Sequence, residues 1–449
     1  MNRMLDINYI KQNRDEVKKV IVSRKAKGVD VEKLLEIHEK YIDVLKKVET
    51  LRNLRNNISS DISKAKESEK GGLISKATEM KTELSDMEKE LDELRKEIDE
   101  MLPLIPNVVS KEMPVGKDEH DNLIVKVWNP RKGYLKMKDS LPYDDVSYAP
   151  GEEFPYKDHI EIGEKLDIID VEQSGKVSGS RFCYLKNEAT VLQDAISSLL
   201  KKELLRRKFI PMVPPLLVKE RSLFGTSHFP EGKSQVYEIK NENVEEGSSL
   251  FLVGSAEPSN FSYFMDKVLK KEELPIKMYA QTTCFRSEVG SWGKDVRGIK
   301  RVHQFDKLEM NCVCTEEQER EVFDEFMEIN EWLFQKLEIP YRVVNKCTGD
   351  CGYNASYFQY DVEAWRPKEK EYMEVGTDTM TTDYQARRLN IKYKDGNGTK
   401  LARTVNDTGA AFGRIIIAIL ENHQQKDGSV NIPKALQKYT GFKRILPKK

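Results

Sequence analysis

The N-terminal quarter of the chain carries apolar residues at alternating steps of three and four positions. From Val31 to Ile62 they fall at Leu34, Ile37, Tyr41, Val44, Val48, Leu51, Ile58 and Ile62, with Arg55 as the one polar interruption. After a polar break, KAKESEKGG, the series continues through Ala77, Met80, Leu84, Met87, Leu91, Leu94, Ile98 and Met101. This spacing is typical of a left-handed coiled coil. It predicts two helices that fold back on each other at the glycine-bearing break, each on the order of 50 Å long, before the prolines of PLIPN.

The outer faces of this predicted arm are charged, which leaves its role open. Such an arm is more often an interaction or dimerisation device than a catalytic one, and a purely structural hairpin is the alternative. Five basic residues toward the tip suit contact with a phosphate backbone: Arg52, Arg55, Lys64, Lys66 and Lys70.

The remainder of the chain predicts an α+β domain. A stretch from Asp118 to Gly179 is rich in Pro, Gly, Asp and Tyr, the composition of a linker. Beyond it the pattern predicts helices over 187–207 and 319–337, separated by the short apolar runs PMVPPLLV, SLFLVG, IKMYAQTTCF and KLEMNCV. Because repeated βαβ alternation and a glycine-rich phosphate loop are both missing, we expect an antiparallel sheet and exclude a P-loop or dinucleotide fold.

Composition narrows the class of protein. At 449 residues the chain has room for two or three domains, and with 33% charged residues and a formal net charge of −1 it carries no global positive field. Any contact with nucleic acid must therefore come from local basic patches. The first residues have no apolar signal core, and no run is long and apolar enough to span a bilayer, so we expect a soluble, cytoplasmic protein.

The six cysteines do not form a disulfide framework in a chain of this size. Two close pairs, Cys312 with Cys314 and Cys347 with Cys351, have four thiols between them for a zinc ion. Neither spacing is the two-residue gap that structural zinc prefers, so we interpret them as ordinary reduced cysteines.

The segment CFRSEVGSWGKDVRGIKRVHQFDKLEM, from Cys284 to Met310, has the residue types that a nucleotide needs. Arg286 suits a bidentate grip on a phosphate, and Glu288 can accept a hydrogen bond from an exocyclic amine such as that of adenine. In a strand, residues two apart share a face, so we expect these two side by side. A simple ion pair on one face is the alternative for an isolated R-x-E.

The rest of this segment strengthens the nucleotide interpretation. Its loop offers glycines that allow close approach to an anion, together with four basic residues: Lys294, Arg297, Lys300 and Arg301. Phe305 offers a flat face for a base, and Glu309 a carboxylate for an amino group. We interpret His303 as a hydrogen-bonded structural residue, not a catalytic one.

A second candidate anion site lies in TVNDTGAAFGRIIIAILENHQ. We expect Gly409 and Gly413 to flank a turn into an apolar helix, with Arg414 in its first turns, where the helix dipole favours an anion. Taken alone, a capped helix with a surface arginine is the alternative. Two arginine sites in one antiparallel domain favour a nucleotide.

Taken together, these pieces resemble the seryl-tRNA synthetases, class II enzymes built on an antiparallel sheet. The resemblance covers nearly the whole chain: MLDINYIKQNRDEVKK and the hairpin, then VPPLLV with GTSHFP, LVGSAE, FRSE to FDKLE, EYMEV with DYQARRLNIKY, and NDTG to FGR, in the family's order. It implies a tRNA-binding region with a coiled-coil arm over 1–110, a linker and the start of the catalytic domain over 111–180, and a class II synthetase catalytic domain over 181–449.

The resemblance also implies roles for individual residues. Arg286 would hold the α-phosphate of ATP and Arg414 the γ-phosphate, as the two catalytic residues, while Glu288 meets the adenine amine. The other positions that match ATP contacts are Ser287, Val302, Phe305, Glu374, Val375, Gly376 and Thr377. Glu374 and Thr377 match the positions that meet Mg²⁺. The positions that match contacts to the serine substrate are Ser255, Ala256, Glu257, Glu309 and Thr408.

The implied activity is ATP-dependent attachment of serine to tRNA through a seryl-adenylate. The amino-acid carboxylate attacks the α-phosphorus, and the ribose hydroxyl of tRNA then takes the aminoacyl group. The resemblance implies a homodimer, with Pro215 matching the interface proline of the first class II motif. In this family the helical arm meets tRNA mainly through its shape and phosphates.

Several positions depart from the family pattern at what we expect to be the amino-acid end. Ser255 replaces a threonine and keeps its hydroxyl. The others are GTDTM after Glu374, with Asp378 and Met380 where the family is serine-rich, Phe358 and Gln359 in place of lysines, and Asp407 in place of glycine. Lineage drift is one explanation. The alternatives are a paralogue that activates another amino acid or charges a carrier and, least supported, a non-catalytic RNA-binding relative.

Overall fold

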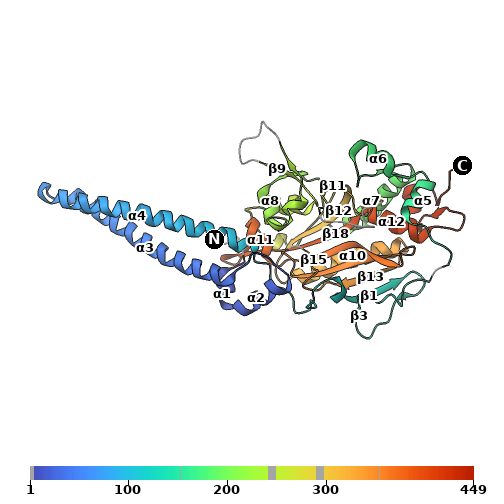
Figure 1. Ribbon diagram of the computed structural model, residues 1–449, viewed down its shortest axis with the longest axis horizontal. Coiled ribbons are helices and arrows are strands. Elements are labelled where there is room, and N and C mark those ends of the chain that lie inside the picture. Colours follow the sequence, from blue (N-terminus) through green and yellow to red (C-terminus); the bar gives the residue numbers. More distant parts are fainter. Residues whose placement is uncertain (1–4, 152, 241–248, 290–297, 353, 449) are drawn as a thin grey trace. The chain divides into compact units, whose positions relative to one another are not determined.

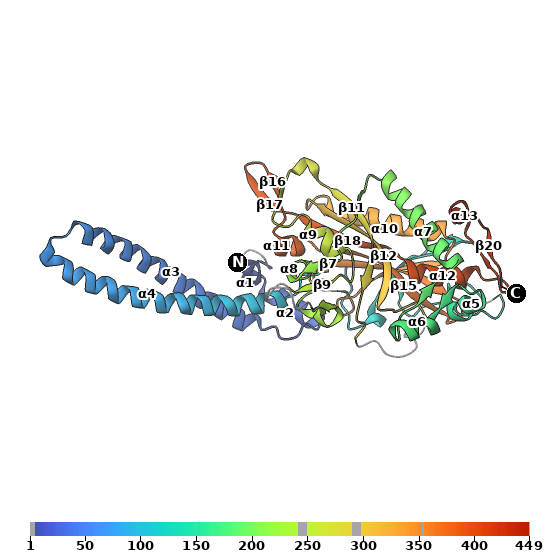
Figure 2. The ribbon, with the colours of Figure 1, turned by 90° about the horizontal axis from the view of Figure 1, so that it is seen from above.

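The computed structural model describes residues 5–151, 153–240, 249–289, 298–352 and 354–448 (Figures 1 and 2). The chain divides into two compact units, residues 1–106 and 107–449. Lys294 and Arg297, predicted above to belong to a basic loop, lie outside the described residues.

The first unit consists of helices. They are α1 (Ile7–Gln12), α2 (Arg14–Ser23), α3 (Val31–Lys64), α4 (Glu67–Met101) and the 3₁₀ helix η1 (Leu102–Leu104). Helices α3 and α4 lie side by side along their length (Figures 1 and 2). The predicted stripe forms one apolar cluster, in which Leu34, Val44, Val48, Leu84 and Ile98 are buried. The prediction of an antiparallel helical arm is thereby confirmed.

The predicted break between the two long helices is wrong in its extent. Helix α4 begins at Glu67, so Ala65 and Lys66 alone separate it from α3, and Gly71 and Gly72 lie inside the helix. A glycine in a helix interior costs about 1 kcal/mol relative to alanine, an amount that the packing of a long helix offsets. Apart from the helix's own backbone, no described atom lies within 4 Å of the position a Cβ would take at either glycine, so neither serves a close approach.

The second unit is built on a ten-stranded sheet. Its order is β2-β1-β13-β14-β15-β18-β12-β11-β6, with β3 paired to β1, and every pair is antiparallel except β11 with β6. The strands are β1 (Leu123–Asn129), β2 (Gly133–Tyr134), β3 (Leu141–Pro142), β6 (Ile210–Met212), β11 (Ile276–Phe285), β12 (Gln304–Cys314), β13 (Tyr341–Asn345), β14 (Phe358–Arg366), β15 (Glu371–Met380) and β18 (Arg403–Ala411). The predicted α+β class with an antiparallel sheet is confirmed.

Smaller elements complete this unit. The remaining strands are β4 (Ile169–Asp170), β5 (Tyr184–Leu185), β7 (Leu217–Lys219), β8 (Glu238–Ile239), β9 (Leu250–Leu252), β10 (Val268–Leu269), β16 (Lys392–Asp395), β17 (Gly398–Leu401), β19 (Val430–Asn431) and β20 (Arg444–Ile445). The helices are η2 (Glu119–Asp121), α5 (His159–Lys165), α6 (Val171–Ser178), α7 (Glu188–Arg206), α8 (Glu220–Gly225), η3 (Glu231–Gln235), α9 (Glu257–Ser262), η4 (Lys271–Glu273), α10 (Glu319–Lys336), α11 (Tyr384–Leu389), α12 (Phe412–His423) and α13 (Lys434–Thr440).

The two predicted helices of this unit, over 187–207 and 319–337, match α7 and α10 closely. Their apolar faces belong to one large core cluster that also contains α12 and the central strands. Helix α10 packs against β15 and β18. The sheet therefore has an α10 face, which is apolar core, and an opposite face, which is called the cavity face below.

The stretch from Asp118 to Gly179 is more than a linker. It supplies β1, whose residues LIVKVWN pair antiparallel with β13 inside the main sheet, and helices α5 and α6. Ile124 and Val127 of β1 are buried. The prolines and glycines that suggest a linker are real turn formers, but they lie around a strand whose partner is more than 200 residues away in sequence.

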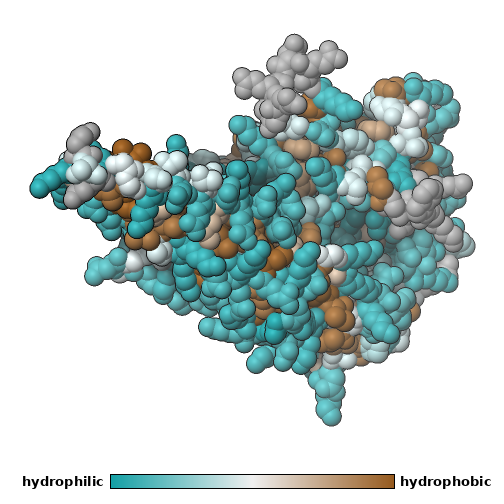
Figure 3. Space-filling model, turned by 60° about the vertical axis from the view of Figure 1, so that its left-hand side comes forward, coloured by the Kyte–Doolittle hydropathy of each residue, from teal (hydrophilic) through white to brown (hydrophobic). Residues whose placement is uncertain are grey.

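Among the described residues, no helix is long and apolar enough to cross a membrane. The face drawn in Figure 3 is mostly hydrophilic, with apolar residues in scattered patches.

Candidate active site

Arg286 and Glu288 follow the end of a strand instead of lying within one. Strand β11 stops at Phe285, and Glu288 has φ 49°, in the left-handed region. The expectation that strand geometry places the two side by side is therefore wrong. The turn leaves the Arg286 guanidinium 5.5 Å from the centroid of the Phe305 ring, with Nε donating to the Gly254 carbonyl at 3.2 Å. The Glu288 carboxylate lies 3.8 Å from the guanidinium of Arg301.

A first cavity opens beside these residues, next to the end of β11, the start of β12 and the first turn of α12. It is lined by Arg286, Glu288, Ile299, Lys300, Arg301, Val302, Phe305, Lys307, Glu374, Val375, Thr408, Ala411, Gly413 and Arg414. Five cationic side chains, the ring of Phe305 and the apolar Val302 therefore face one space. This combination suits a polyanion that ends in a flat, apolar base.

Arg414 reaches this cavity from the first turn of α12. Its Nη1 donates to the main-chain oxygen and to Oε1 of Glu374, both at 3.0 Å. The expected turn flanked by Gly409 and Gly413 is wrong, because Gly409 lies in β18 and the chain passes from β18 directly into α12. Gly413 serves a close approach instead, since a Cβ there would stand 3.2 Å from the Ile299 carbonyl oxygen.

A β-bulge brings Glu374 and Thr377 together. Residues three apart in a regular strand point to opposite faces, but the β14–β15 register skips Val375, so both side chains face the cavity. Thr377 Oγ1 donates to Glu374 Oε1 at 3.3 Å. Partial loss of water would raise the pKa of Glu374, yet the charges of Arg414, Lys346 and Arg286 hold that pKa below its usual value. An ionised carboxylate beside a hydroxyl is a fitting pair of hard oxygen donors for Mg²⁺.

A second cavity continues along the cavity face. It is lined by Thr226, His228, Ser255, Glu257, Arg286, Lys307, Glu309, Lys346, Asp350, Gly352, Ala355, Ser356, Gln359, Asp361, Glu374, Thr377, Thr379, Thr381, Gln385, Asn406 and Thr408. Of the residues predicted to contact the amino acid, Ser255, Glu257, Glu309 and Thr408 line it. Four residues line both cavities: Arg286, Lys307, Glu374 and Thr408.

The carboxyl of Glu257 is a buried acid of the second cavity. Its Oε1 accepts from the Gln385 amide at 2.7 Å and from the Asn406 amide. Burial raises the pKa of Glu257 to about 7, although the two amide donors act in the opposite direction. Glu257 therefore keeps its proton to a higher pH than an exposed glutamate, and a cationic ligand beside it would favour the ionised form.

Glu309 and Thr408 meet because of a second bulge. The β12–β18 register skips Gly409, which sets Thr408 opposite Glu309, and Thr408 Oγ1 donates to Glu309 Oε1 at 3.2 Å. The ammonium of Lys307 forms an ion pair with the same oxygen. These three polar groups project from the paired strands β12 and β18 into one small space, which suits recognition of a small polar molecule.

The other predicted site residues take supporting places. Ser287 turns its hydroxyl to the Ser234 carbonyl at 2.6 Å, and Ala256 is fully buried at the start of α9. Gly376 faces α10, where a Cβ would stand 3.4 Å from the Asn330 amide. Val375, the bulge residue, lines the first cavity. The Pro215 carbonyl accepts from the Ser259 hydroxyl at 2.6 Å.

Sequence reasoning missed several cavity residues. The structure adds Lys307, Lys346, Asp361, Gln385 and Asn406. Lys346 is a mostly buried cation that pairs with Asp350 and, at 3.2 Å, with Asp361. Lys307 and Asn406 lie inside FDKLE and NDTG, where strand alternation with Glu309 and Thr408 was an available signal. Lys346 and Gln385 gave no local signal, because strand β13 and helix α11 bring them in from elsewhere.

His228 is a further cavity residue that the sequence did not single out. Its Nδ1 lies 2.9 Å from the Thr226 hydroxyl. Burial, assisted by the charges of Arg286 and Lys307, lowers the pKa of His228 to about 3. The imidazole is therefore neutral at physiological pH.

The family departures divide between the two faces of the sheet. Phe358, Met380, Asp378 and Asp407 lie on the α10 face or in its core. The departures that line the second cavity are Ser255, Gln359, and Thr377 and Thr379 of GTDTM. Asp378 and Asp407 stand opposite each other across β15 and β18, both fully buried, and Asn330 of α10 donates to Asp407 at 2.7 Å. The expectation that all of these changes gather at the amino-acid end is wrong for Phe358, Asp378, Met380 and Asp407, because strand alternation turns them away from the second cavity.

The cysteines are free thiols in the structure. Cys312 and Cys314 lie buried within β12, as the apolar run suggested, and Cys347 and Cys351 flank the loop that follows β13. Among the described residues, no group of three or more His, Cys, Asp and Glu side chains forms a metal site.

Two family models match this chain. The model described as the seryl-tRNA synthetase N-terminal domain matches residues 4–109. The model described as the class II tRNA synthetase core domain (G, H, P, S and T) matches residues 237–423.

Curated relatives match along the full length. The chain is 39% identical to a serine–tRNA ligase of Pyrococcus furiosus, covering 99% of this chain and 98% of that protein. It is also 39% identical to a serine–tRNA ligase of Treponema denticola, covering 98% and 100%. Among solved structures, the seryl-tRNA synthetase of Pyrococcus horikoshii complexed with ATP matches with a TM-score of 0.88 at 36% identity, covering 99% of this chain and all of that one.

Proposed function

The chain belongs to the seryl-tRNA synthetase family, and from this premise we propose that it attaches serine to tRNA in a reaction driven by ATP. The observation that carries the proposal is the junction of the two cavities at Arg286, Lys307, Glu374 and Thr408. One cavity has the cations and the aromatic ring that a nucleotide requires. The other has buried carboxylates and hydroxyls that suit a small amino acid. The reacting atoms would meet where the cavities join.

In the first step a carboxylate oxygen of serine attacks the α-phosphorus of ATP in line. A new oxygen–phosphorus bond forms and the bond to the bridging oxygen breaks, so that seryl-adenylate and pyrophosphate result. Arg286 lies beside the reacting phosphate and offsets the charge that builds on its oxygens, while pyrophosphate leaves toward Arg414. Phe305 and Val302 hold the base, and Glu288 accepts from its amine.

Glu257 and Glu309 would bind the substrate ammonium, and Thr408 its hydroxyl or carboxylate. Glu374 and Thr377 would hold Mg²⁺, which supplies further neutralisation of phosphate charge. In the second step the terminal ribose hydroxyl of tRNA attacks the activated carbonyl, and AMP leaves as the aminoacyl ester forms. The basic residues toward the tip of the α3–α4 hairpin suit the phosphates of the tRNA.

We also propose that the protein acts as a homodimer in the cytoplasm, where its tRNA and ATP substrates are found. Apolar side chains around Pro215 support the dimer. Val213 is fully exposed, and Ile210 and Leu217 are exposed by 50% and 43%. A second copy of this surface would remove them from water. Light scattering after size-exclusion chromatography measures the mass in solution, and a monomer mass would overturn this part of the proposal.

Exchange of radioactive pyrophosphate into ATP, measured with each amino acid separately, tests the proposed reaction. We expect a serine-dependent signal that disappears in Arg286→Ala. Exchange with a different amino acid would favour the paralogue, which is supported by the family departures that line the second cavity, Gln359 among them. Absence of exchange with every amino acid would leave the binding-only relative.

A further inference from the structure

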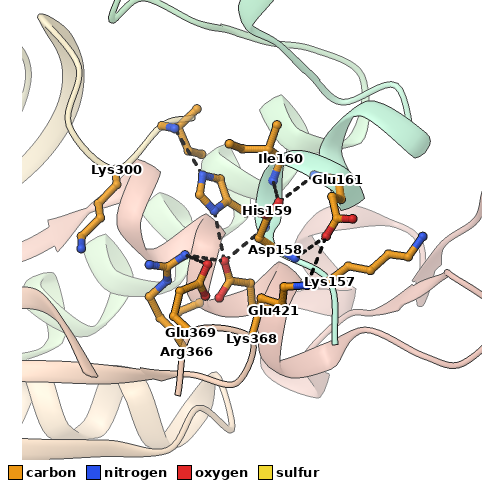
Figure 4. A network of polar contacts seen from close by, with 12 residues as sticks. Lys157, Asp158, His159, Ile160, Glu161, Lys300, Arg366, Lys368, Glu369 and Glu421 are labelled. Carbon is orange, nitrogen blue, oxygen red and sulfur yellow. Dashed lines mark hydrogen bonds and ion pairs between the residues drawn. The ribbon is translucent and has the colours of Figure 1, made fainter. Parts of the chain in front are cut away.

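We infer that a buried network of His159, Glu421 and Arg366 is a positioning site that fixes the backbone of residues 298–300, one wall of the first cavity (Figure 4). The inference rests on the proposed function, since it assigns ATP to that cavity. None of the three residues lines the cavity itself. They act through the main chain that does, so they are positioning residues and not catalytic ones.

The network centres on one carboxylate oxygen. Glu421 is fully buried in α12, and its Oε1 lies 3.1 Å from both the main-chain nitrogen and the Nδ1 of His159, the first residue of α5. Figure 4 shows the imidazole of His159 pointing toward Glu421, with Arg366 beside it. Because the main-chain nitrogen of Ile299 donates to Nε2, Nε2 is the accepting ring nitrogen, and Nδ1 is the one that donates to Glu421 Oε1.

The opposite edge of the same imidazole meets the cavity wall. His159 Nε2 accepts from the main-chain nitrogen of Ile299 at 3.4 Å, the long end of hydrogen-bonding range. Gly298 has φ +78°, and a Cβ there would stand 2.1 Å from His159 Nε2. The backbone therefore rests directly on the ring edge, and Ile299 and Lys300, which follow, line the first cavity.

Arg366 joins the network to the wall from a second direction. Its Nη2 donates to Glu421 Oε1 at 3.0 Å, and its Nη1 donates to Glu371 at 3.1 Å. Glu371 also lies 3.8 Å from the ammonium of Lys300. Because Arg366 ends β14 and Glu371 begins β15, the network ties residues 298–300 to the strand that carries Glu374 and Val375.

The hydrogen-bond pattern has a direct consequence for ATP binding. The wall is held by an acceptor on Nε2, while the donor on Nδ1 only orients the ring. A side chain that keeps the Nε2-side acceptor should keep the wall in place, and one that keeps only the Nδ1-side donor should not. If His159 were only a structural residue, both changes would lower thermal stability and neither would change the affinity for ATP.

His159→Asn and His159→Gln separate these two functions. The amide nitrogen of asparagine takes the place of Nδ1, whereas the longer glutamine reaches the place of Nε2 with its amide oxygen. We expect His159→Asn to raise the Kd for ATP about three- to tenfold, the effect of one lost buried hydrogen bond, and His159→Gln to stay within about twofold of the parent. Isothermal titration calorimetry with ATP and Mg²⁺, without amino acid, measures this on the full chain.

His423→Asn is the matched control. This histidine lies on α12, as Glu421 does, and is half-buried. Its Nε2 donates to the main-chain oxygen of Leu337 at 2.8 Å, and it does not line the first cavity. We expect it to lower the melting temperature and leave the Kd for ATP unchanged. Equal ATP affinity in His159→Asn and the parent, or equal weakening in His159→Asn and His159→Gln, would overturn the inference. The calorimetric measurement of ATP binding needs no amino acid, so it is independent of pyrophosphate exchange. A failure of serine-dependent exchange would therefore count against the proposed function alone.

Discussion

The two cavities that meet at Arg286 are lined by contrasting kinds of side chains. The first is lined by side chains from strand ends and a helix start, with cations that remain partly exposed, such as Arg301 and Arg414. The second is lined by groups from the middle of β12, β14, β15 and β18 together with groups from α9, α11 and loops. Its Glu257 and Glu309 are buried and already hydrogen-bonded to protein.

The difference reflects the ligands that each cavity is proposed to hold. A triphosphate brings several charges of its own and needs many flexible, solvated cations, each of which contributes modestly. A small polar amino acid offers few contacts, so selectivity requires rigid, desolvated partners that are left unpaired by the wrong ligand. Four substitutions test this contrast, from the largest expected effect on exchange to the smallest.

Arg286→Ala should have the largest effect, because Arg286 serves both cavities. We expect serine-dependent pyrophosphate exchange to fall about 10²- to 10³-fold, the loss typical of removing one donor from developing charge. The main loss should appear in kcat. Arg131→Ala removes an exposed arginine that pairs with Glu153 outside both cavities, and it should leave exchange unchanged. If Arg286→Ala exchanged pyrophosphate as fast as the parent protein, the reaction could not be placed where the two cavities meet.

Glu257→Gln should come second and should act on serine alone. We expect kcat/KM for serine to fall about ten- to hundredfold, with KM for ATP unchanged, because a charge-assisted hydrogen bond to the ammonium is lost. The pKa of Glu257, raised by burial to about 7, also predicts the pH profile. Below pH 7 the carboxyl takes up a proton and loses its negative charge, so kcat/KM of the parent should fall toward acid.

Glu319→Gln is the matched control for this profile. Burial raises the pKa of Glu319 to about 7 as well, but its carboxyl accepts from the Thr382 main chain and lines neither cavity. The acid limb of the profile should therefore persist in Glu319→Gln and flatten in Glu257→Gln. The same acid limb in both variants would assign the titration to another group.

Gln359→Leu should have a smaller effect on the second cavity. The Gln359 amide oxygen accepts from the Gly352 main chain at 2.9 Å, and its nitrogen donates to Asp361 at 3.0 Å. Loss of these bonds should raise KM for serine about two- to tenfold. Steady-state exchange kinetics measure the change, with Gln318→Leu, a glutamine that bridges Thr315 and Leu274 elsewhere, as the control. A gain of exchange with another amino acid would show instead that Gln359 sets specificity.

Asp378→Asn should leave exchange unchanged and raise stability. Burial, with the charges of Asp407 and Asp324, raises the pKa of Asp378 well above its usual value. The folded state thus keeps a proton on Asp378 that the unfolded chain releases above about pH 4. The contribution of this residue to stability is therefore fully present below that pH and is lost as the pH rises through the folded-state pKa. Asparagine does not titrate, so it removes this loss. We expect the free energy of unfolding at pH 8 to rise by about 1 to 3 kcal/mol.

Urea unfolding at pH 5 and pH 8 measures this effect. The gain from Asp378→Asn should be larger at pH 8, while exchange kinetics match the parent at both values. Altered KM for serine in Asp378→Asn would show that the α10 face influences the second cavity, which would weaken the contrast between the two faces of the sheet.

Much of this protein was predictable from local patterns. The apolar spacing of three and four residues predicted the two arm helices. It could do so because the seam of a coiled coil repeats along the sequence itself and does not depend on distant residues. Arg286, Phe305, Glu309 and Arg414 were identified because their residue types match the chemistry of a nucleotide and an amine. The antiparallel class followed from short apolar runs without βαβ alternation.

Other features depended on partners distant in sequence. The pairing of Glu374 with Thr377, and of Glu309 with Thr408, requires bulges at Val375 and Gly409, which exist only in the register with β14 and β12. The strand alternation that follows from these registers also places Asp378 and Asp407 on the α10 face. Strand β1 and Lys346 were overlooked because their neighbours come from other parts of the chain.

The sequence by itself thus determined which helices form in the arm and which residue types serve the two cavities. The tertiary structure decided which side of each strand faces a cavity, and which buried groups support its walls. The physical reason is that a strand has a period of two, so a single bulge reverses every position beyond it, and that reversal depends on the neighbouring strand.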